Sequence, residues 1–531
     1  MTFVVPVRDL AFWQRPKVTE ALRTVLHFMS DDTYNFRFRK QHRREFRQEY
    51  FDFGDQADWL FSSVDRIVLF SGGLDSFAGA VSRLEQKQKL VLVTHRPQPS
   101  LDARVKALFQ QLRQTYDTPM FHIPVWVNKA SSLTQEFTQR TRSFLYAAVA
   151  TAVASSLSAE GICFYENGVV SLNWPIADEV VAARATKTTH PKTLFLLQSF
   201  LRLVLEREFV VENPFQFKTR TEVVSTLRGS AAEKLIQHTR SCSRGYYVSG
   251  TQWHCGRCSQ CVDRRIALIA AGLEDREMSS DYVADVLTGP RPNHIDRNMA
   301  LDYARFACEI HGMKIEEVVS RYALPLAEPL LAFSGAARKT AAVQYVEMMM
   351  RHANSVHGVL QSALVRHSAD VLDGKIASDS LIALLTQGLH RSPRWKRCAE
   401  RLASILQEAV PTACKDNPPR NENHLRDICE AILKGHRPKL DSEFPALKWA
   451  LAQAKPDLSS GECQLFIELK YVRDTTTPAK VTGEIAEDIT KYTDNDRRVL
   501  FLIYDPTRLV VNDTELVEQI ERPGVLARII R

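Results

Sequence analysis

Hydrophobic and polar positions follow different periods along this chain, and the period changes between its predicted parts. From residue 66, short apolar runs typical of buried strands alternate with longer stretches of helical spacing. The predicted strands are 66–70, 90–94, 120–127 and 161–165, and the predicted helices are 101–116, 144–157 and the stretch after Asp75. Strands that alternate with helices predict an α/β fold with a parallel, doubly wound sheet.

The segments on either side have other patterns. Residues 1–60 open with an apolar run, predicted as a strand, and continue into a basic and aromatic stretch at 36–53. We expect a small β-rich accessory region with a solvated charged face, although this stretch would also suit contact with nucleic acid. Beyond residue 275 the spacing is mostly helical, for example at 300–308, 341–353 and 376–389.

The last part of the chain starts a new pattern. The sequence Asn-Pro-Pro-Arg at 417–420 is typical of a linker. After it come a helix, pairs of strands, a helix and a strand, which predict a separate small α/β unit. Four parts are therefore predicted: an N-terminal region 1–60, an α/β domain 61–275, a helical region 276–415 and a C-terminal domain 416–531.

Length and composition agree with several soluble domains. A chain of 531 residues is expected to hold about three or four. The formal net charge of +7 permits contact with nucleic acid but does not by itself indicate it. No apolar run approaches the roughly 20 residues that span a bilayer, and the first residues lack a signal-peptide pattern. We expect a cytoplasmic protein without a membrane partner.

The most informative segment is 67–76, Ile-Val-Leu-Phe-Ser-Gly-Gly-Leu-Asp-Ser. A buried strand leads into glycines, which leave backbone N–H groups open to an anion, and then into a helix start with its positive dipole end. This order predicts a phosphate-binding loop; the alternative is a Ser-Gly turn that only caps the helix. The predicted ATP-binding residues are Ser71, Gly72, Gly73, Leu74, Asp75 and Ser76, with Thr94 and His95 at the end of the next strand.

No Gly-Lys-Ser/Thr follows the glycines, so this is not a Walker A loop. The segment instead matches the SGGxDS signature of the PP-loop ATP pyrophosphatases. Those enzymes cleave ATP between the α- and β-phosphates, activate a substrate oxygen as an adenylate and release pyrophosphate. Asp75 is predicted as a catalytic residue that holds either Mg²⁺ or the loop itself.

Four cysteines have the spacing of a structural zinc site. Cys255, Cys258 and Cys261 form two Cys-x-x-Cys steps that share the middle residue, and Cys242 is the predicted fourth ligand. Four thiolates without an open position describe a closed tetrahedral Zn²⁺ site rather than a catalytic one. His254 stays open as a substitute for Cys242.

The loop and the cysteines, in this order and separation, resemble the 7-cyano-7-deazaguanine synthases (QueC) over about residues 64–272. Those enzymes combine a PP-loop domain with a four-cysteine zinc site that ends in CGxCxxC. The segment 219–224 also resembles the family's T-K-x-E-I stretch, with Arg220 in place of the lysine, and Arg142 begins a segment similar to its R-N-x-x. The resemblance implies ATP, Mg²⁺ and Zn²⁺ as cofactors and a carboxylate substrate such as 7-carboxy-7-deazaguanine.

Two segments depart from that family. Thr94-His95-Arg96 stands where the family has aspartate-tyrosine-glycine, and 166–173 replaces its substrate-binding segment. This divergence resembles that of the QueC-like proteins found in bacterial antiviral gene clusters. In such a protein the activated acyl group could pass to another amine, and partner proteins from the same cluster are expected.

The C-terminal domain carries a second candidate site. Asp457 follows a proline, and Glu468 and Lys470 lie two residues apart on a predicted strand, so their side chains share one face. Two carboxylates suit Mg²⁺, and the lysine suits activation of water against a phosphodiester. The pattern resembles the PD-(D/E)xK restriction-endonuclease-like fold, DpnII/MboI-type branch, which implies DNA as a partner. Glu443, with Glu422 behind it, is the candidate further acid at the magnesium site.

The combination predicts an ATP-dependent ligase of the PP-loop class joined to a nuclease-like domain, acting in defence against foreign DNA. One alternative is a housekeeping 7-cyano-7-deazaguanine synthase for tRNA or DNA modification. The other is a non-catalytic ATP-sensing protein whose nuclease fold binds DNA without cleaving it.

Overall fold

The computed structural model divides the chain into two compact units, Met1–His390 and Arg391–Arg531, called here the first and second units. It describes residues 2–41, 64–95, 99–127, 140–174, 187–244, 252–389, 393–435, 440–442, 447–449, 452–460, 465–492 and 498–531. The boundary between the units falls inside the predicted helical region 276–415, and the division of residues 1–275 into two parts stays a prediction.

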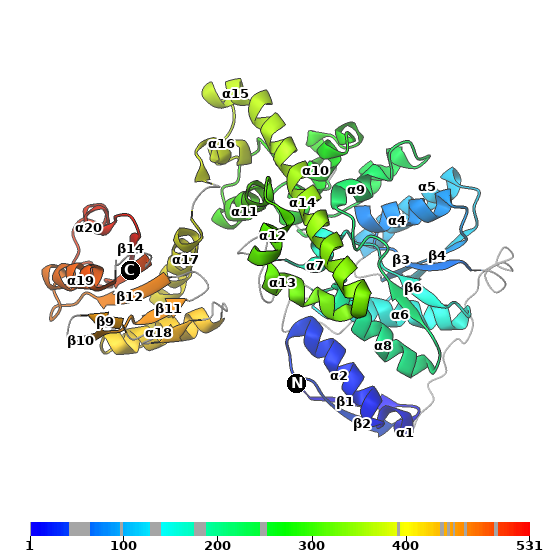
Figure 1. Ribbon diagram of the computed structural model, residues 1–531, viewed down its shortest axis with the longest axis horizontal. Helices are drawn as coiled ribbons and strands as arrows, with labels where there is room; N and C mark the ends of the chain where they lie inside the picture. The colour runs from blue at the N-terminus through cyan, green and yellow to red at the C-terminus, as the bar shows by residue number, and fades with distance from the viewer. Residues whose placement is uncertain are drawn as a thin grey trace. The chain divides into compact units, whose positions relative to one another are not determined.

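A five-stranded sheet lies at the centre of the first unit (Figure 1). Its strands are β3 (Arg66–Leu69), β4 (Leu90–His95), β5 (Met120–Val125), β6 (Gly161–Cys163) and β7 (Val210–Glu212). The order is β5-β4-β3-β6-β7, and every neighbouring pair is parallel. The predicted α/β pattern with a parallel sheet is confirmed. After β3, the next strands in sequence (β4 and β5) are added on one side of the sheet. After β6, the next strand (β7) is added on the other side, so the strand order reverses between β3 and β6.

Helices cover both faces of this sheet because successive residues of its strands direct apolar side chains to opposite faces. Val68 belongs to one core cluster, and its neighbours Ile67 and Leu69 belong to another. The first cluster includes residues of α4 (Leu74–Glu85), α5 (Pro99–Thr115), α9 (Arg220–Ser225) and α10 (Ser259–Ala270). The second includes residues of α2 (Pro16–Ser30), α6 (Arg142–Ser156) and α8 (Pro191–Leu205).

The N-terminal region contains more helix than expected. Strand β1 (Thr2–Val7) pairs in parallel with β2 (Asn35–Lys40), and α1 (Leu10–Trp13) and α2 lie between them in sequence. The β-rich description is therefore wrong for these residues, because buried Val18, Leu22 and Val25 give α2 an apolar face against the core. The basic and aromatic stretch lies mostly outside the described residues.

The predicted helical region 276–415 belongs to the first unit only as far as residue 390. Its main helices are α11 (His294–Ile310), α12 (Ile315–Arg321), α13 (Ala323–Ala327), α14 (Gly335–Arg366), α15 (Ser368–Leu372) and α16 (Leu381–Thr386). The helix predicted at 376–389 is shorter than expected, because the Ser380 side chain accepts a hydrogen bond from the Ala383 N–H and caps α16 there. Cys255, Cys258 and Cys261 share a core cluster with α11, α14 and α16.

The remaining short elements of the first unit are α7 (Gly168–Leu172), η3 (Glu233–His238), η4 (Glu274–Arg276), η5 (Ser279–Asp281) and η6 (Pro329–Ala332).

The second unit is built on a mixed sheet of order β14-β13-β12-β11-β8. Its strands are β8 (Asp441–Ser442), β11 (Leu458–Ser460), β12 (Leu465–Tyr471), β13 (Arg498–Tyr504) and β14 (Val525–Ile530), and its helices are α17 (Arg394–Cys414), α18 (Glu422–Gly435), α19 (Pro478–Tyr492) and α20 (Asp513–Ile520). A separate pair is formed by β9 (Leu447–Trp449) and β10 (Ala452–Ala454). Strands β12, β13 and β14 are parallel, and β11 runs antiparallel to β12.

The predicted linker at 417–420 is wrong as a boundary between units. It joins α17 to α18, and both helices pack in one core cluster with β12. Proline here ends one helix and precedes the next within the same unit. Among the described residues, none of the helices combines the length and apolarity that a bilayer crossing requires.

Candidate functional site

The Ser-Gly-Gly loop, residues 71–76, lies at the carboxyl end of β3, where the strand order reverses. In parallel α/β sheets this crevice is the usual place for a ligand. Gly72 has φ +74°, and a Cβ there would lie 2.8 Å from Val105 Cγ2, so both conformation and space require glycine. Ser71 Oγ lies 3.1 Å from Ser76 Oγ and accepts from the Gly73 N–H. The Leu74 side chain is buried in the core, so only its backbone faces the loop.

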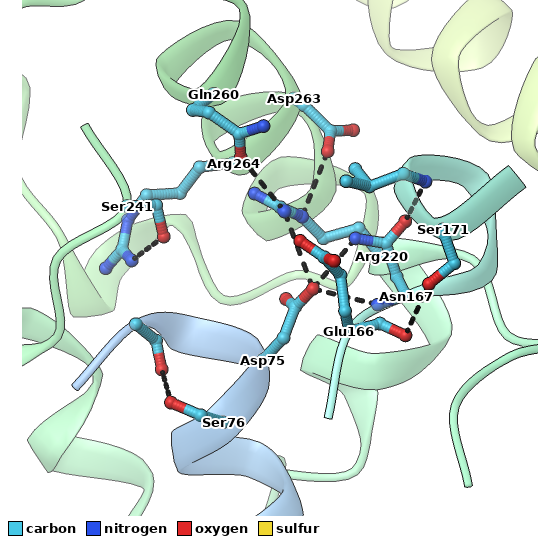
Figure 2. A network of polar contacts seen from close by, with 12 residues as sticks. Asp75, Ser76, Glu166, Asn167, Ser171, Arg220, Ser241, Gln260, Asp263 and Arg264 are labelled. Carbon is cyan, nitrogen blue, oxygen red and sulfur yellow. Dashed lines mark hydrogen bonds and ion pairs between the residues drawn. The ribbon is translucent and has the colours of Figure 1, made fainter. Parts of the chain in front are cut away.

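A network of polar contacts joins Asp75 to residues far away in sequence (Figure 2). Asp75 Oδ2 accepts from the Asn167 backbone N–H at 3.0 Å and from Asn167 Nδ2 at 2.8 Å. Arg220 Nη2 lies 3.5 Å from the same oxygen. Asp75 Oδ1 is buried and has no hydrogen-bond partner among the described residues. One oxygen therefore fixes the loop, and the other is left for a bound cation or donor.

Arg220 is held from its other side as well. Its Nε lies 2.9 Å from Asp263 Oδ2 on α10, and Asp263 Oδ1 accepts from the Tyr303 hydroxyl at 2.6 Å on α11. Burial works against the charge of the guanidinium, but Asp75 and Asp263 outweigh it and raise the Arg220 pKa. A buried cation with two carboxylate neighbours is a rigid link between α4, α9 and α10. Through Tyr303, the helical region reaches this site.

Glu166 lies at the carboxyl end of β6, beside Asp75. Its Oε2 accepts from the hydroxyls of Thr188 and Thr189, and its backbone oxygen accepts from Asn213 Nδ2 at 2.8 Å. Burial raises the pKa of this carboxyl, and the negative charge of Asp75 acts in the same direction. Glu166 and Asp75 are thus two acids close to one another at the strand-order reversal.

Thr94 and His95 end β4 and bond to neighbouring chain segments. Thr94 Oγ1 donates to the Phe70 carbonyl at 2.6 Å, and His122 Nε2 lies 2.9 Å from the same hydroxyl. His95 Nε2 lies 3.1 Å from the Val127 carbonyl oxygen. Both residues are at the expected sheet edge, with hydrogen bonds that tie adjacent strands together.

Sequence reasoning missed Glu166, Asn167 and Asp263 as members of this network. The signals were weak, because these residues lie far from Asp75 in sequence and their local pattern does not show that they contact it. One local signal was readable: Thr219 and Glu222 form a capping box at the start of α9, and this fixes Arg220 in the first turn.

The four-cysteine cluster is assembled as predicted. The sulfur atoms of Cys242, Cys255, Cys258 and Cys261 all lie within 4.8 Å of one another. Backbone N–H groups of Arg257 and Cys258 donate to Cys255 Sγ at 3.4 and 3.3 Å, as suits a thiolate ligand.

Gly256 is required for this turn. Its φ is +73°, and a Cβ there would lie 1.7 Å from the Ala284 carbonyl oxygen. The chemistry of the donors and their separation fit a tetrahedral metal ion.

Two neighbours of the cluster, His254 and Arg264, contact Glu277. His254 Nε2 lies 3.0 Å from Glu277 Oε1, so His254 as a substitute ligand is not favoured over Cys242. Arg264 is fully buried and pairs with Glu277 rather than with the thiolates. Its Nη2 also donates to the Ile236 carbonyl and Thr239 Oγ1.

We expect purified protein to contain about one zinc ion per chain, because a closed four-thiolate site binds this ion tightly. Elemental analysis should show that zinc is lost in Cys242→Ala. Cys308→Ala, which changes an exposed cysteine, is the matched control and should retain the metal. A wild-type protein without zinc, or full zinc in Cys242→Ala, would contradict the assignment.

The second unit brings its predicted residues together on β12. Glu468 and Lys470 alternate with Ile467 and Leu469, which pack against α17 and α18, so the two polar side chains face α19. Lys470 Nζ lies 2.8 Å from Asp488 Oδ2 on α19 and 3.8 Å from Glu468 Oε2.

Asp457 and the candidate further acids lie at the edges of this site. Asp457 Oδ2 accepts from the Leu469 N–H at 2.8 Å, and Glu422 Oε1 accepts from the Tyr471 N–H at 3.2 Å. Asp488 was missed as a direct partner of the lysine. The side chain of Glu443 lies outside the described residues.

Burial raises the pKa values of two acids in this site, Glu468 and Asp457. Burial raises the pKa of Glu468 to about 9, and the charge of Asp457 adds to the effect. Burial also raises the pKa of Asp457. For Lys470, burial is outweighed by Asp488, and its pKa is raised. The site therefore holds a charged lysine beside acids that favour a proton or a metal ion.

Comparison with known proteins identifies this second domain. The DpnII-MboI family, described as REase_DpnII-MboI, matches residues 396–528. The match begins in α17 and ends in β14, and it covers less than half of the chain. The second unit thus carries a restriction-endonuclease-like domain, for which DNA is the expected partner and Mg²⁺ the expected ion. None of the curated proteins matches the chain.

Proposed function

We propose that the first unit is a QueC-like enzyme with a PP-loop, doubly wound fold. It uses ATP and Mg²⁺ to adenylate a carboxylate, such as 7-carboxy-7-deazaguanine or a related acid. The second unit is a Mg²⁺-dependent DNA nuclease, and the two act together in antiphage defence. Zn²⁺ in the four-cysteine cluster has a structural role.

The observation that carries the ATP proposal is the Ser-Gly-Gly loop at the strand-order reversal, with Asp75 buried behind it. Backbone N–H groups of a glycine loop and the start of α4 stabilise phosphate oxygens. Asp75 Oδ2 is occupied by Asn167 and Arg220, and Oδ1 has no hydrogen-bond partner among the described residues. This free oxygen supports a role for Asp75 toward Mg²⁺.

The proposed reaction places negative charge at this loop. A carboxylate oxygen of the substrate attacks the α-phosphorus, the bond to the β-phosphate bridging oxygen breaks, and pyrophosphate leaves. A nitrogen nucleophile then attacks the acyl adenylate and AMP leaves, which gives an amide or, after loss of water, a nitrile. Oriented N–H groups that meet developing phosphate charge are an effective form of catalysis.

For the second unit, Asp457 and Glu468 would hold Mg²⁺ and Lys470 would assist water against a phosphodiester. The match to a restriction-endonuclease family supports this. The pairing of a nuclease with a base-chemistry domain is the reason for proposing defence against foreign DNA. A housekeeping synthase is less favoured, because Glu166 and Asn167 take the place of the family's substrate segment.

We expect pyrophosphate release from Mg-ATP that depends on 7-carboxy-7-deazaguanine and is at least ~10²-fold slower in Asp75→Ala. The variant removes the acid that positions the loop. Asp275→Ala, at an exposed position of the same unit, is the matched control and should keep wild-type activity.

The same assay separates the alternatives. ATP binding without substrate-dependent release would favour the ATP-sensing DNA-binding protein. Formation of only the free nitrile, without transfer to another amine, would favour the housekeeping synthase. Absence of ATP binding in the wild type would contradict the proposal.

A further inference from the structure

Two arginines border the Ser-Gly-Gly loop, and neither entered the sequence predictions. Arg104 precedes Val105 on α5, and Val105 Cγ2 is the atom that a Cβ at Gly72 would meet at 2.8 Å. Arg240 follows η3, and its backbone N–H donates to the Gly72 carbonyl at 3.0 Å. A Cβ on Gly73 would lie 3.4 Å from the Arg240 carbonyl oxygen. Both segments are therefore in contact with the loop itself.

The Arg104 guanidinium has an aromatic platform. Its Cζ lies 4.4 Å from the centroid of the Trp253 ring. The backbone N–H of Trp253 donates to the Asp281 carbonyl at 2.9 Å, which fixes the segment that leads into Cys255. Stacking on tryptophan orients a guanidinium plane while it leaves the N–H groups at its edge available.

Within the described part of the chain, no carboxylate pairs with the charge of Arg104. Its Nη1 is buried and has no hydrogen-bond partner among the described residues. Burial lowers the pKa of Arg104, and the positive charge of Arg240 lowers it further. A partly buried cation beside a like charge is unfavourable unless an anion binds there. The loop that Val105 and the Arg240 backbone contact is a glycine loop, and this indicates which anion the cation would meet.

We propose that Arg104, stacked on Trp253 and assisted by Arg240, binds the β- and γ-phosphates of a nucleoside triphosphate and the free pyrophosphate after cleavage. This rests on the proposed ATP-using function of the first unit. Guanidinium groups bind phosphate oxygens through paired, charge-assisted hydrogen bonds. The Ser-Gly-Gly loop and the two arginines then contact the leaving group from different sides. Trp253 connects this contact to the four-cysteine cluster.

Calorimetric titration of the full chain with inorganic pyrophosphate and Mg²⁺ tests the assignment. We expect Arg104→Gln to weaken pyrophosphate binding by at least ~10-fold, because a charge-assisted pair is lost. Binding of AMP should be unchanged. Arg104→Lys, which keeps a charge, should retain part of the affinity. Arg113→Gln, at an exposed position of the same helix, is the control and should bind pyrophosphate as the wild type does.

The outcomes separate this assignment from the function on which it rests. Wild-type affinity for pyrophosphate in Arg104→Gln would overturn the assignment alone, as would an equal loss of AMP binding. A wild-type chain that binds neither ATP nor pyrophosphate would overturn the proposed function as well. Weaker pyrophosphate binding in Arg104→Gln, with AMP binding and melting temperature unchanged, is the result that supports the assignment.

Discussion

Replacement of Arg264 by methionine is expected to lower the free energy of unfolding of the first unit by about 3–5 kcal/mol, because it leaves a buried charge without its partner. Arg264 is fully buried and contacts both carboxylate oxygens of Glu277, at 3.0 and 3.1 Å. It also donates to the Ile236 carbonyl on η3. Without the guanidinium, the described residues would leave the Glu277 carboxylate with His254 and Tyr282 as its close polar partners.

Denaturant unfolding of the full chain, followed by a signal from the first unit, measures this effect. Arg276→Met is the matched control: Arg276 pairs with Glu233 at 2.6 Å, but its side chain is 40% exposed. An exposed pair contributes less than about 1 kcal/mol. If both substitutions lowered the free energy of unfolding equally, burial of the Arg264–Glu277 pair would not explain the effect.

Replacement of Glu468 by glutamine is expected to slow DNA cleavage by at least ~10²-fold and yet to stabilise the metal-free second unit at alkaline pH. The folded-state pKa of Glu468 is about 9, against 4.5 for an ordinary glutamate. Between these values the folded state holds a proton that the unfolded state releases. Stability therefore falls as pH rises from about 4.5 to about 9, by at most ~1.4 kcal/mol per pH unit, and glutamine removes this loss.

Thermal unfolding at pH 6 and pH 8, with EDTA or with Mg²⁺, tests both parts. In EDTA the stability advantage of Glu468→Gln should grow from pH 6 to pH 8. Added Mg²⁺ should stabilise the wild type more than the variant, since the ion binds the ionised carboxylate. Glu487→Gln, 75% exposed on α19, is the control and should behave as the wild type. The same advantage at both pH values would contradict the raised pKa.

Four strands of the first sheet, β3 to β6, could be predicted because their runs are short and apolar, whereas the three-residue edge strand β7 was not predicted. Runs such as 66–70 and 90–94 are nearly continuous in apolar residues, whereas strands with one face in solvent alternate apolar and polar residues. The four-cysteine cluster was predictable for a related reason: three of its ligands lie within seven residues, and their spacing alone restricts the geometry.

The polar network could not be predicted in the same way. Asp75, Arg220 and Asp263 lie on α4, α9 and α10, and Asn167 caps α7. Asn167 and Asp263 are ordinary polar residues in their local sequence. Only the strand order, with β3 beside β6, brings Asp75 and Asn167 together. Helix α2 was not predicted, although buried Val18, Leu22 and Val25 recur at helical spacing between β1 and the charged stretch.

The shared core of the four-cysteine cluster with α11, α14 and α16 restricts how genes could exchange this protein's parts. A recombination breakpoint near residue 275 would separate Tyr303 from Asp263 and expose the apolar side of the cysteines. A breakpoint near residue 390 falls between the two compact units and cuts neither core. Recombination would therefore exchange the segment 1–390 as a whole, and the nuclease-like unit is the part that could be exchanged separately.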